Sequence, residues 1–129
     1  MIAIDTNVLV RVIVEDTGQP EQTKIARDLV ENAKKVYLSQ IVQVECTWVL
    51  AKVYKIDNAS LLAVLEHLLI NPAFILQHPE HFKTAIDLFR LGHADFADCL
   101  IVTESSYLDT VLYTFDKRLA LHSNTRLLS

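Results

Sequence analysis

The sequence predicts an α/β protein with a parallel sheet, and three observations support this fold class. Short apolar runs typical of buried strands alternate with longer segments whose apolar residues recur at helical spacing. Strands and helices that alternate in this way form parallel sheets with right-handed crossovers. A hydrophobic fraction of 51% against 22% charged residues excludes a disordered chain. With no linker, repeat or low-complexity segment in its 129 residues, we expect one domain over residues 1–129.

The elements follow one another with recognisable start and stop signals. Pro20 and Pro79 suit first helical turns, Ser39 and Asp57 are candidate helix caps, and Gly92 ends a helix. The expected strands are residues 2–4, 36–38, 74–76 and 110–114, with an edge strand at 127–128. The expected helices are residues 7–14, 20–35, 40–54, 59–70, 79–92 and 94–102, with a short helix at 117–121.

Four acidic residues follow strand ends or begin helices, where open α/β folds bind ligands. Asp5 and Asp116 come directly after apolar strands. Glu45 falls in the second turn of a helix that begins at a strand end, on the same face as apolar residues, and Asp98 falls in the first turn of another helix. We therefore expect these four carboxylates to reach one cleft.

Carboxylates that share a cleft repel one another unless a cation neutralises them. Ligands that are all oxygen favour hard ions, so the expected cation is Mg²⁺ or Mn²⁺. Such an ion acidifies a bound water and holds a phosphate oxygen in line for displacement. The expected reaction is thus metal-assisted hydrolysis of a phosphodiester.

Four stretches of the sequence resemble the sequence blocks of PIN-domain ribonucleases, most closely the VapC-like toxins of bacterial type II toxin–antitoxin systems. They are IDTNVLVR, LSQIVQVECTWVL, ADFADCLIV and LYTFDKRL, and together they span nearly the whole chain. The resemblance implies a three-layer α/β/α sandwich with a central parallel sheet of four to five strands. It also implies a Mg²⁺- or Mn²⁺-dependent endoribonuclease.

The resemblance assigns roles to individual positions of this chain. Asp5 and Asp98 become metal ligands, and Glu45 and Asp116 act directly or through water. Small polar residues beside these acids would orient carboxylates or waters, and they are Thr6, Asn7, Ser39 and Thr114. Asp95 either caps its helix or shares the site with Asp98, and for Ser39, Thr114 and Asp116 a capping role is the simpler alternative.

The same resemblance implies partners: an RNA substrate, a cognate antitoxin protein and a second copy of the chain in a homodimer. No apolar run approaches the roughly 20 residues of a membrane helix, and no signal peptide is visible. Cys46 and Cys99 lie inside helical patterns and form no metal-type pair, which indicates reduced core thiols in a cytoplasmic protein. A net charge of −4 argues against a generic basic nucleic-acid coat, but it leaves room for local cations such as Arg11, Lys117 and Arg118.

Two other functions compete with the nuclease. A non-catalytic interaction module is suggested by the helix at 59–70, whose apolar residues cover more than one face. A receiver or HAD-like phosphoryl-transfer domain also places Asp after parallel strands, but a HAD enzyme needs a second Asp where this chain has Asn7. Only two glycines occur, which excludes glycine-rich phosphate loops. Trp48 is expected to anchor the core.

Overall fold

The computed structural model describes residues 1–129 and consists of two compact units, Met1–Pro79 and Glu80–Ser129. It confirms the α/β class, with six α-helices and strands that pair only in parallel. The elements of the first unit are β1 (Ile2–Ala3), α1 (Thr6–Ile13), α2 (Pro20–Ala33), β2 (Val36–Leu38), α3 (Gln40–Lys52), α4 (Asn58–Ile70) and β3 (Phe74–Leu76). Those of the second are α5 (Pro79–Phe89), α6 (Phe96–Tyr107), β4 (Leu112–Thr114), the 3₁₀ turn η1 (Leu119–Leu121) and β5 (Thr125–Leu127).

The strands pair as a three-stranded sheet in the order β1-β2-β3 and a two-stranded sheet of β4 and β5. All five strands are parallel, in agreement with the expected α/β fold built on a parallel sheet and a three-layer α/β/α sandwich. The first strand is short, and its ladder with β2 covers only Ile2 and Ala3. The chain leaves β1 early because Asp5 caps the helix that begins at Thr6.

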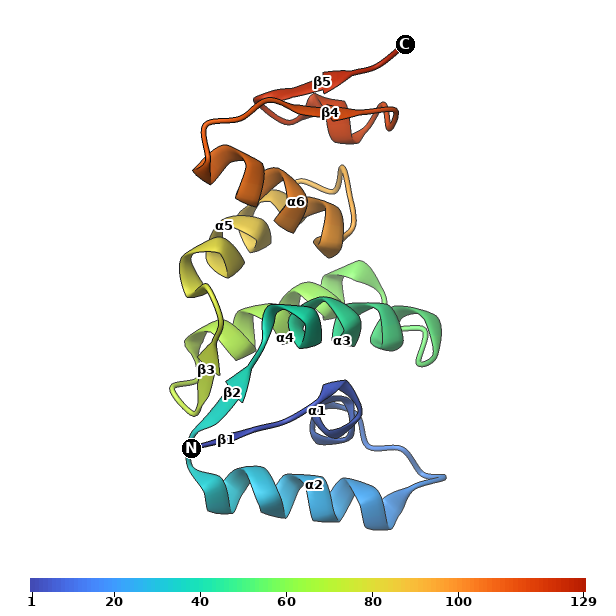
Figure 1. The fold of residues 1–129 in the computed structure, drawn as a ribbon. Helices are drawn as coiled ribbons and strands as arrows, with labels where there is room; N and C mark the ends of the chain where they lie inside the picture. Colours follow the sequence, from blue (N-terminus) through green and yellow to red (C-terminus); the bar gives the residue numbers. More distant parts are fainter. The chain divides into compact units, whose positions relative to one another are not determined.

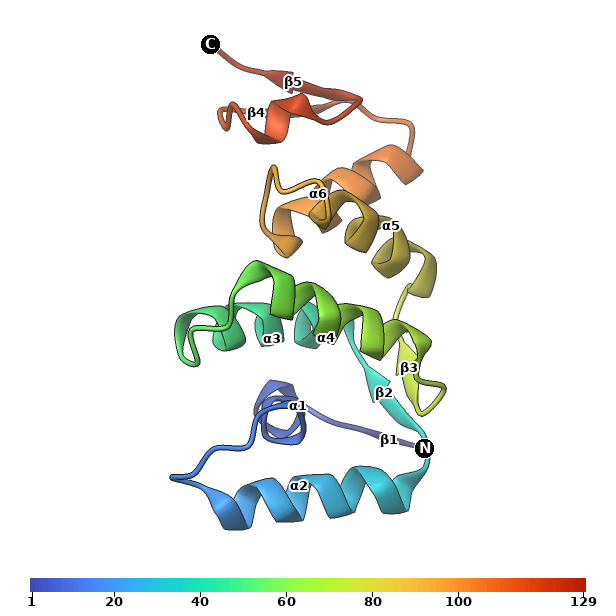
Figure 2. The same cartoon turned by 180° about the vertical axis from the view of Figure 1, so that it is seen from behind.

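The first unit is held together by contacts of α1 with both α2 and α3. In both views α1 lies between α2 and the pair formed by α3 and α4 (Figures 1 and 2). The buried face of α4 carries Leu61, Leu65 and Leu68, whereas Ile70 at its end is 76% exposed. The helix therefore packs on one side, although its composition is apolar all round.

The second unit has an aromatic core between α5 and α6. Phe96 stands edge-on to Phe82 and to Phe89, with ring centroids 5.4 and 6.2 Å apart. All three rings are buried, and such edge-to-face pairs are favourable beyond the area that they bury. This packing fixes the start of α6, where Asp95 and Asp98 lie.

The remaining expectations on the core have mixed outcomes. Cys46 and Cys99 are buried free thiols, as predicted. The prediction that Trp48 anchors the core is wrong, because its side chain is 45% exposed; α3 turns Cys46, Thr47 and Leu50 inward instead. None of the helices combines the length and apolar composition needed to cross a bilayer.

Candidate active site

Asp5 lies two residues after β1 and caps the helix α1. Its backbone is extended, at φ −89° and ψ −178°, and its Oδ1 accepts a hydrogen bond from the backbone N–H of Val8 over 3.1 Å. A carboxylate at this position also interacts favourably with the positive end of the helix dipole. The side chain stays exposed, so the cap leaves Asp5 accessible to a ligand.

Thr6 and Glu45 are brought together from positions 39 residues apart. The hydroxyl of Thr6 donates to Oε1 of Glu45 over 2.9 Å, and Glu45 is exposed on α3. A hydroxyl that donates to a carboxylate restricts the rotation of that carboxylate. The structure thus gives Thr6 the contact that an orienting residue needs.

The start of α3, which carries Glu45, is fixed by a group of amides that the sequence did not reveal. Ser39 caps the helix as expected, accepting from the N–H of Val42 over 3.3 Å. Gln43 is completely buried and donates to the carbonyls of Leu38 and Gln77, over 3.1 and 3.0 Å. Those carbonyls lie at the carboxyl ends of β2 and β3, so Gln43 ties the helix to both strands.

Asn7 lies beside Asp5 on the wall of an open hollow of about 300 Å³ in the first unit. The other lining residues are Val8, Arg11, Gln22, Ile25, Ala26 and Leu29. Ile25 and Leu29 expose 68% and 44% of their surface there. The hollow therefore combines a carboxylate with an accessible apolar wall.

Arg11, a candidate contact for RNA phosphate, is already paired inside the first unit. It donates to the hydroxyl of Tyr54 and to Oε1 of Gln22, and it lies 3.6 Å from the carboxylate of Asp16. The pKa of Asp16 is lowered, chiefly by the N–H of Gly18 and the hydroxyl of Tyr54, with a smaller effect of Arg11. Arg11 thus forms part of an internal network.

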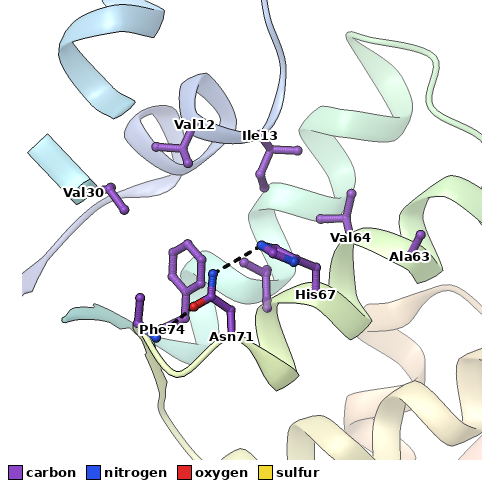
Figure 3. A pocket seen from close by; sticks show the side chains of 10 residues that line it. Val12, Ile13, Val30, Ala63, Val64, His67, Asn71 and Phe74 are labelled. Carbon is purple, nitrogen blue, oxygen red and sulfur yellow. Dashed lines mark hydrogen bonds between the residues drawn. The ribbon is translucent and has the colours of Figure 1, made fainter. Parts of the chain in front are cut away.

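A second and larger hollow of the first unit, about 460 Å³, contains none of the predicted site residues. Figure 3 shows its apolar side chains from α1, α2 and α4, with His67 and Asn71 turned toward one another among them. The amide Nδ2 of Asn71 lies 3.4 Å from Nε2 of His67.

In the second unit, Asp95 caps α6 and lies close to Asp98. Its Oδ1 accepts from the backbone N–H of Asp98 over 2.8 Å, which confirms the capping role. The pKa of Asp98 is raised, first by partial burial and then by the negative charges of Asp95 and Asp116. The three carboxylates are therefore near enough to act on one another.

Asp116 is held in the turn that follows β4. Its Oδ1 accepts from the N–H groups of Arg118 and Leu119 over 2.9 and 3.1 Å, and its own N–H donates to the hydroxyl of Thr114 over 2.9 Å. The guanidinium of Arg118 donates to the carbonyl of Gly92 over 2.6 Å. Arg118 thus ties this turn to the loop before α6, a contact between residues 26 apart that the sequence did not indicate.

The predicted residues accordingly form two groups, each within its own unit. Asp5, Thr6, Asn7, Ser39 and Glu45 belong to the first unit, and Asp95, Asp98, Thr114 and Asp116 to the second. Neither unit contains three or more His, Cys, Asp or Glu side chains already arranged around a metal position. The available donors are nevertheless all carboxylate, hydroxyl or amide oxygens. The pKa of Asp98 is raised first by burial and then by the neighbouring negative charges, which a hard cation would neutralise, so the donor set fits Mg²⁺ or Mn²⁺.

Comparison with known proteins gives one family. The family model described as PIN domain matches residues 2–123, a span that includes every predicted site residue. No curated protein and no solved structure matches the chain.

Proposed function

The chain belongs to the PIN domain family, and on this premise we propose that it is a metal-dependent endoribonuclease toxin that a cognate antitoxin neutralises. PIN domains are generally nucleases, and those nucleases typically use divalent metal ions. The finer statements, namely RNA as substrate, internal cleavage, Mg²⁺ or Mn²⁺ as the ion and the toxin role, are our proposal.

The observation that carries this proposal is the cluster of three carboxylates in the second unit, Asp95, Asp98 and Asp116. Asp98 has a raised pKa because it is partly buried and because Asp95 and Asp116 repel its negative charge. An arrangement of like charges destabilises a fold, and it is expected where a cation or a reacting group uses it. In a nuclease family, a divalent cation is the natural counter-charge.

We propose that Asp5 and Asp98 bind the ion, and that Glu45 and Asp116 bind it directly or through water. When bound, a hard divalent ion neutralises phosphate charge and supplies an acidified water at neutral pH. No side-chain nucleophile is then needed, which agrees with the burial of both thiols.

The protein's own contribution is orientation. The hydroxyl of Thr6 holds the carboxylate of Glu45. Asp95 fixes the first turn of α6, and the hydroxyl of Thr114 fixes the backbone of Asp116. Positions held in this way lower the cost of ordering the reacting groups.

The toxin role implies protein partners, an antitoxin and a second copy of the chain. The hollow beside Asp5 supports the first, because Ile25 and Leu29 offer apolar surface next to a proposed ligand. A protein segment bound in this hollow would cover the apolar surface of Ile25 and Leu29 and also the carboxylate of Asp5. We further propose that the protein acts in the cytoplasm, in line with its two free cysteines.

The second candidate is a PIN-like module that binds partners without catalysis, and the exposed apolar residues of α2 favour it. Titration with Mn²⁺ separates the two functions, since a scaffold does not need the metal. The family match favours either of them over a receiver or HAD-like phosphoryl-transfer domain.

The toxin proposal is tested by induced expression followed by sequencing of cellular RNA ends. Wild-type chain should arrest growth and create new RNA ends at a limited set of sites, and Asp5→Asn should do neither. Co-expression of the neighbouring open reading frame should abolish both effects. Growth arrest that Asp5→Asn retains at equal protein levels would contradict the proposal.

A further inference from the structure

We propose that the exposed aromatic side chains of Tyr113 and Phe115 form a stacking platform for unpaired bases of single-stranded RNA next to Asp116. This inference rests on the proposed nuclease function and names the class of RNA that reaches the site. Three observations support it: the exposure of the two aromatic side chains, the pairing of β4 with β5, and the positively charged residues near them.

Tyr113 and Phe115 are exposed, whereas the residue between them is partly buried. Tyr113 exposes 57% of its surface and Phe115 exposes 80%, and Thr114 is half-buried. Tyr113 lies in β4, and Phe115 lies in the bend that directly follows the strand. Both rings are therefore open to solvent at the carboxyl end of β4.

Phe115 is the most exposed of the large hydrophobic side chains in the chain, at 80%. A phenylalanine ring contributes most to stability when it is buried, and the core rings of this unit, such as Phe82 and Phe96, are nearly inaccessible. Those core rings also pair edge-to-face with one another. Exposed aromatic rings of this kind are the side chains on which unpaired bases stack in proteins that bind single strands.

Positive charge flanks the aromatic side chains. Arg126 of β5 is the register partner of Tyr113, and Lys117 and Arg118 follow Asp116 directly. The side chains of all three are exposed in a chain whose net charge is −4. Exposed aromatic residues interleaved with cations are the combination by which proteins bind single strands, with bases on the rings and phosphates on the cations.

The position of the platform selects RNA bases over the apolar surface of another protein as its occupant. Phe115 directly precedes Asp116 in the chain, so a base stacked on Phe115 would lie next to a proposed site residue. Bases inside a duplex are already stacked and paired, and they do not offer a free face. The platform therefore predicts a preference for unpaired segments.

The test is binding of a 12-nucleotide single-stranded RNA that carries 2-aminopurine, measured in EDTA so that no cleavage occurs. Wild-type chain should quench the 2-aminopurine fluorescence, because a base stacked on a ring is quenched. Phe115→Ala should bind roughly 5- to 100-fold more weakly and lose the quenching, as expected for one lost base–ring stack. Phe115→Tyr should retain both properties, whereas Phe115→Leu, which keeps apolar area without a ring, should not.

Leu108→Ala is the matched control, because Leu108 is 76% exposed, lies in the same unit and is outside β4. It should bind RNA as the wild type does, and thermal melting should show that all variants fold. The platform is refuted if Phe115→Leu binds and quenches like the wild type, or if Phe115→Ala changes only the sedimentation of the chain. In the latter case the face is a protein contact. If wild-type chain neither binds nor cuts RNA, the nuclease function fails with it; if it cuts RNA and Phe115→Ala binds equally well, only the platform fails.

Discussion

Replacing Gln43 by leucine should destabilise the protein, although it puts an apolar residue of similar size into a buried position. Gln43 donates to the carbonyls of Leu38 and Gln77, and it is completely buried. Leucine removes both donors. The carbonyl of Leu38 keeps its bond from the N–H of Gln77, whereas the carbonyl of Gln77 loses a partner in a partly buried position.

The magnitude follows from these contacts. The bond to Leu38 is worth about 1 kcal/mol, and an acceptor left without a partner costs about 1–3 kcal/mol. Against this, Oε1 of Gln43 is itself buried without a partner, so its removal recovers about 1–2 kcal/mol. At the middle of these ranges, the net loss is about 1.5 kcal/mol in the free energy of unfolding. With a urea dependence of about 2 kcal/mol per molar, the unfolding midpoint should fall by about 0.5–1 M.

Gln40→Leu is the matched control on the same helix. The side-chain Nε2 of Gln40 is buried without a partner, and only its backbone N–H is bonded, to Oε1 of Gln77. The same chemical change should therefore leave the urea midpoint unchanged or raise it. A Gln43→Leu variant as stable as the wild type, or a Gln40→Leu variant destabilised to the same extent, would show that the amide bonds do not fix α3.

Three further predictions concern the carboxylates. Thr6→Val should lower the rate of RNA cleavage about 10-fold, as loss of a residue that orients a proposed site acid does, with little change in the thermal melting temperature. Asp116→Asn should lower the pKa of Asp98 toward its ordinary value, which carbon-detected NMR titration of metal-free protein measures. Asp98→Asn should raise the free energy of unfolding at pH 7. Because folding raises the pKa of Asp98, the ionised carboxylate destabilises the folded state at pH values above that pKa, and the variant removes this charge. The difference in stability between variant and wild type should vanish as the pH falls below the pKa that Asp98 has in the unfolded chain.

Each of these predictions has a result that contradicts it. Unchanged cleavage by Thr6→Val would mean that the bond to Glu45 does not matter to the reaction. If the pKa of Asp98 is the same in Asp116→Asn as in the wild type, the two carboxylates do not interact in solution. An Asp98→Asn variant less stable than the wild type at pH 7 would mean that the ionised carboxylate stabilises the fold.

The order of helices and strands was predictable from the sequence, because it depends on local signals. Ser39, Asp57 and Asp95 cap helices as their positions indicated. The spacing of apolar residues was a less reliable guide to burial at Trp48. Helix α3 is apolar on most sides, so its sequence does not indicate which face packs against the core. Local signals do not determine which strands pair, so the order β1-β2-β3 and the pairing of β4 with β5 are known from the structure alone.

The predicted acids are accessible or partly buried, but the contacts that hold them come from residues distant in sequence. Gln43 reaches the carbonyl of Gln77 across 34 positions, and Arg118 reaches that of Gly92 across 26. The only indication in the sequence was that Gln43, an amide, stands among the apolar residues of α3. The raised pKa of Asp98 likewise depends on burial, which spacing along the chain does not reveal.

The central claim is that carboxylates of this chain support metal-dependent cleavage inside an RNA strand. The most direct measurement is incubation of purified protein with a circular single-stranded RNA, which has no ends for an exonuclease. The account predicts that the wild type linearises the circle in Mg²⁺ or Mn²⁺ but not in EDTA, and that Asp98→Asn leaves it intact under all three conditions. A circle that the wild type does not open with either metal, or that Asp98→Asn opens as fast, would contradict the account.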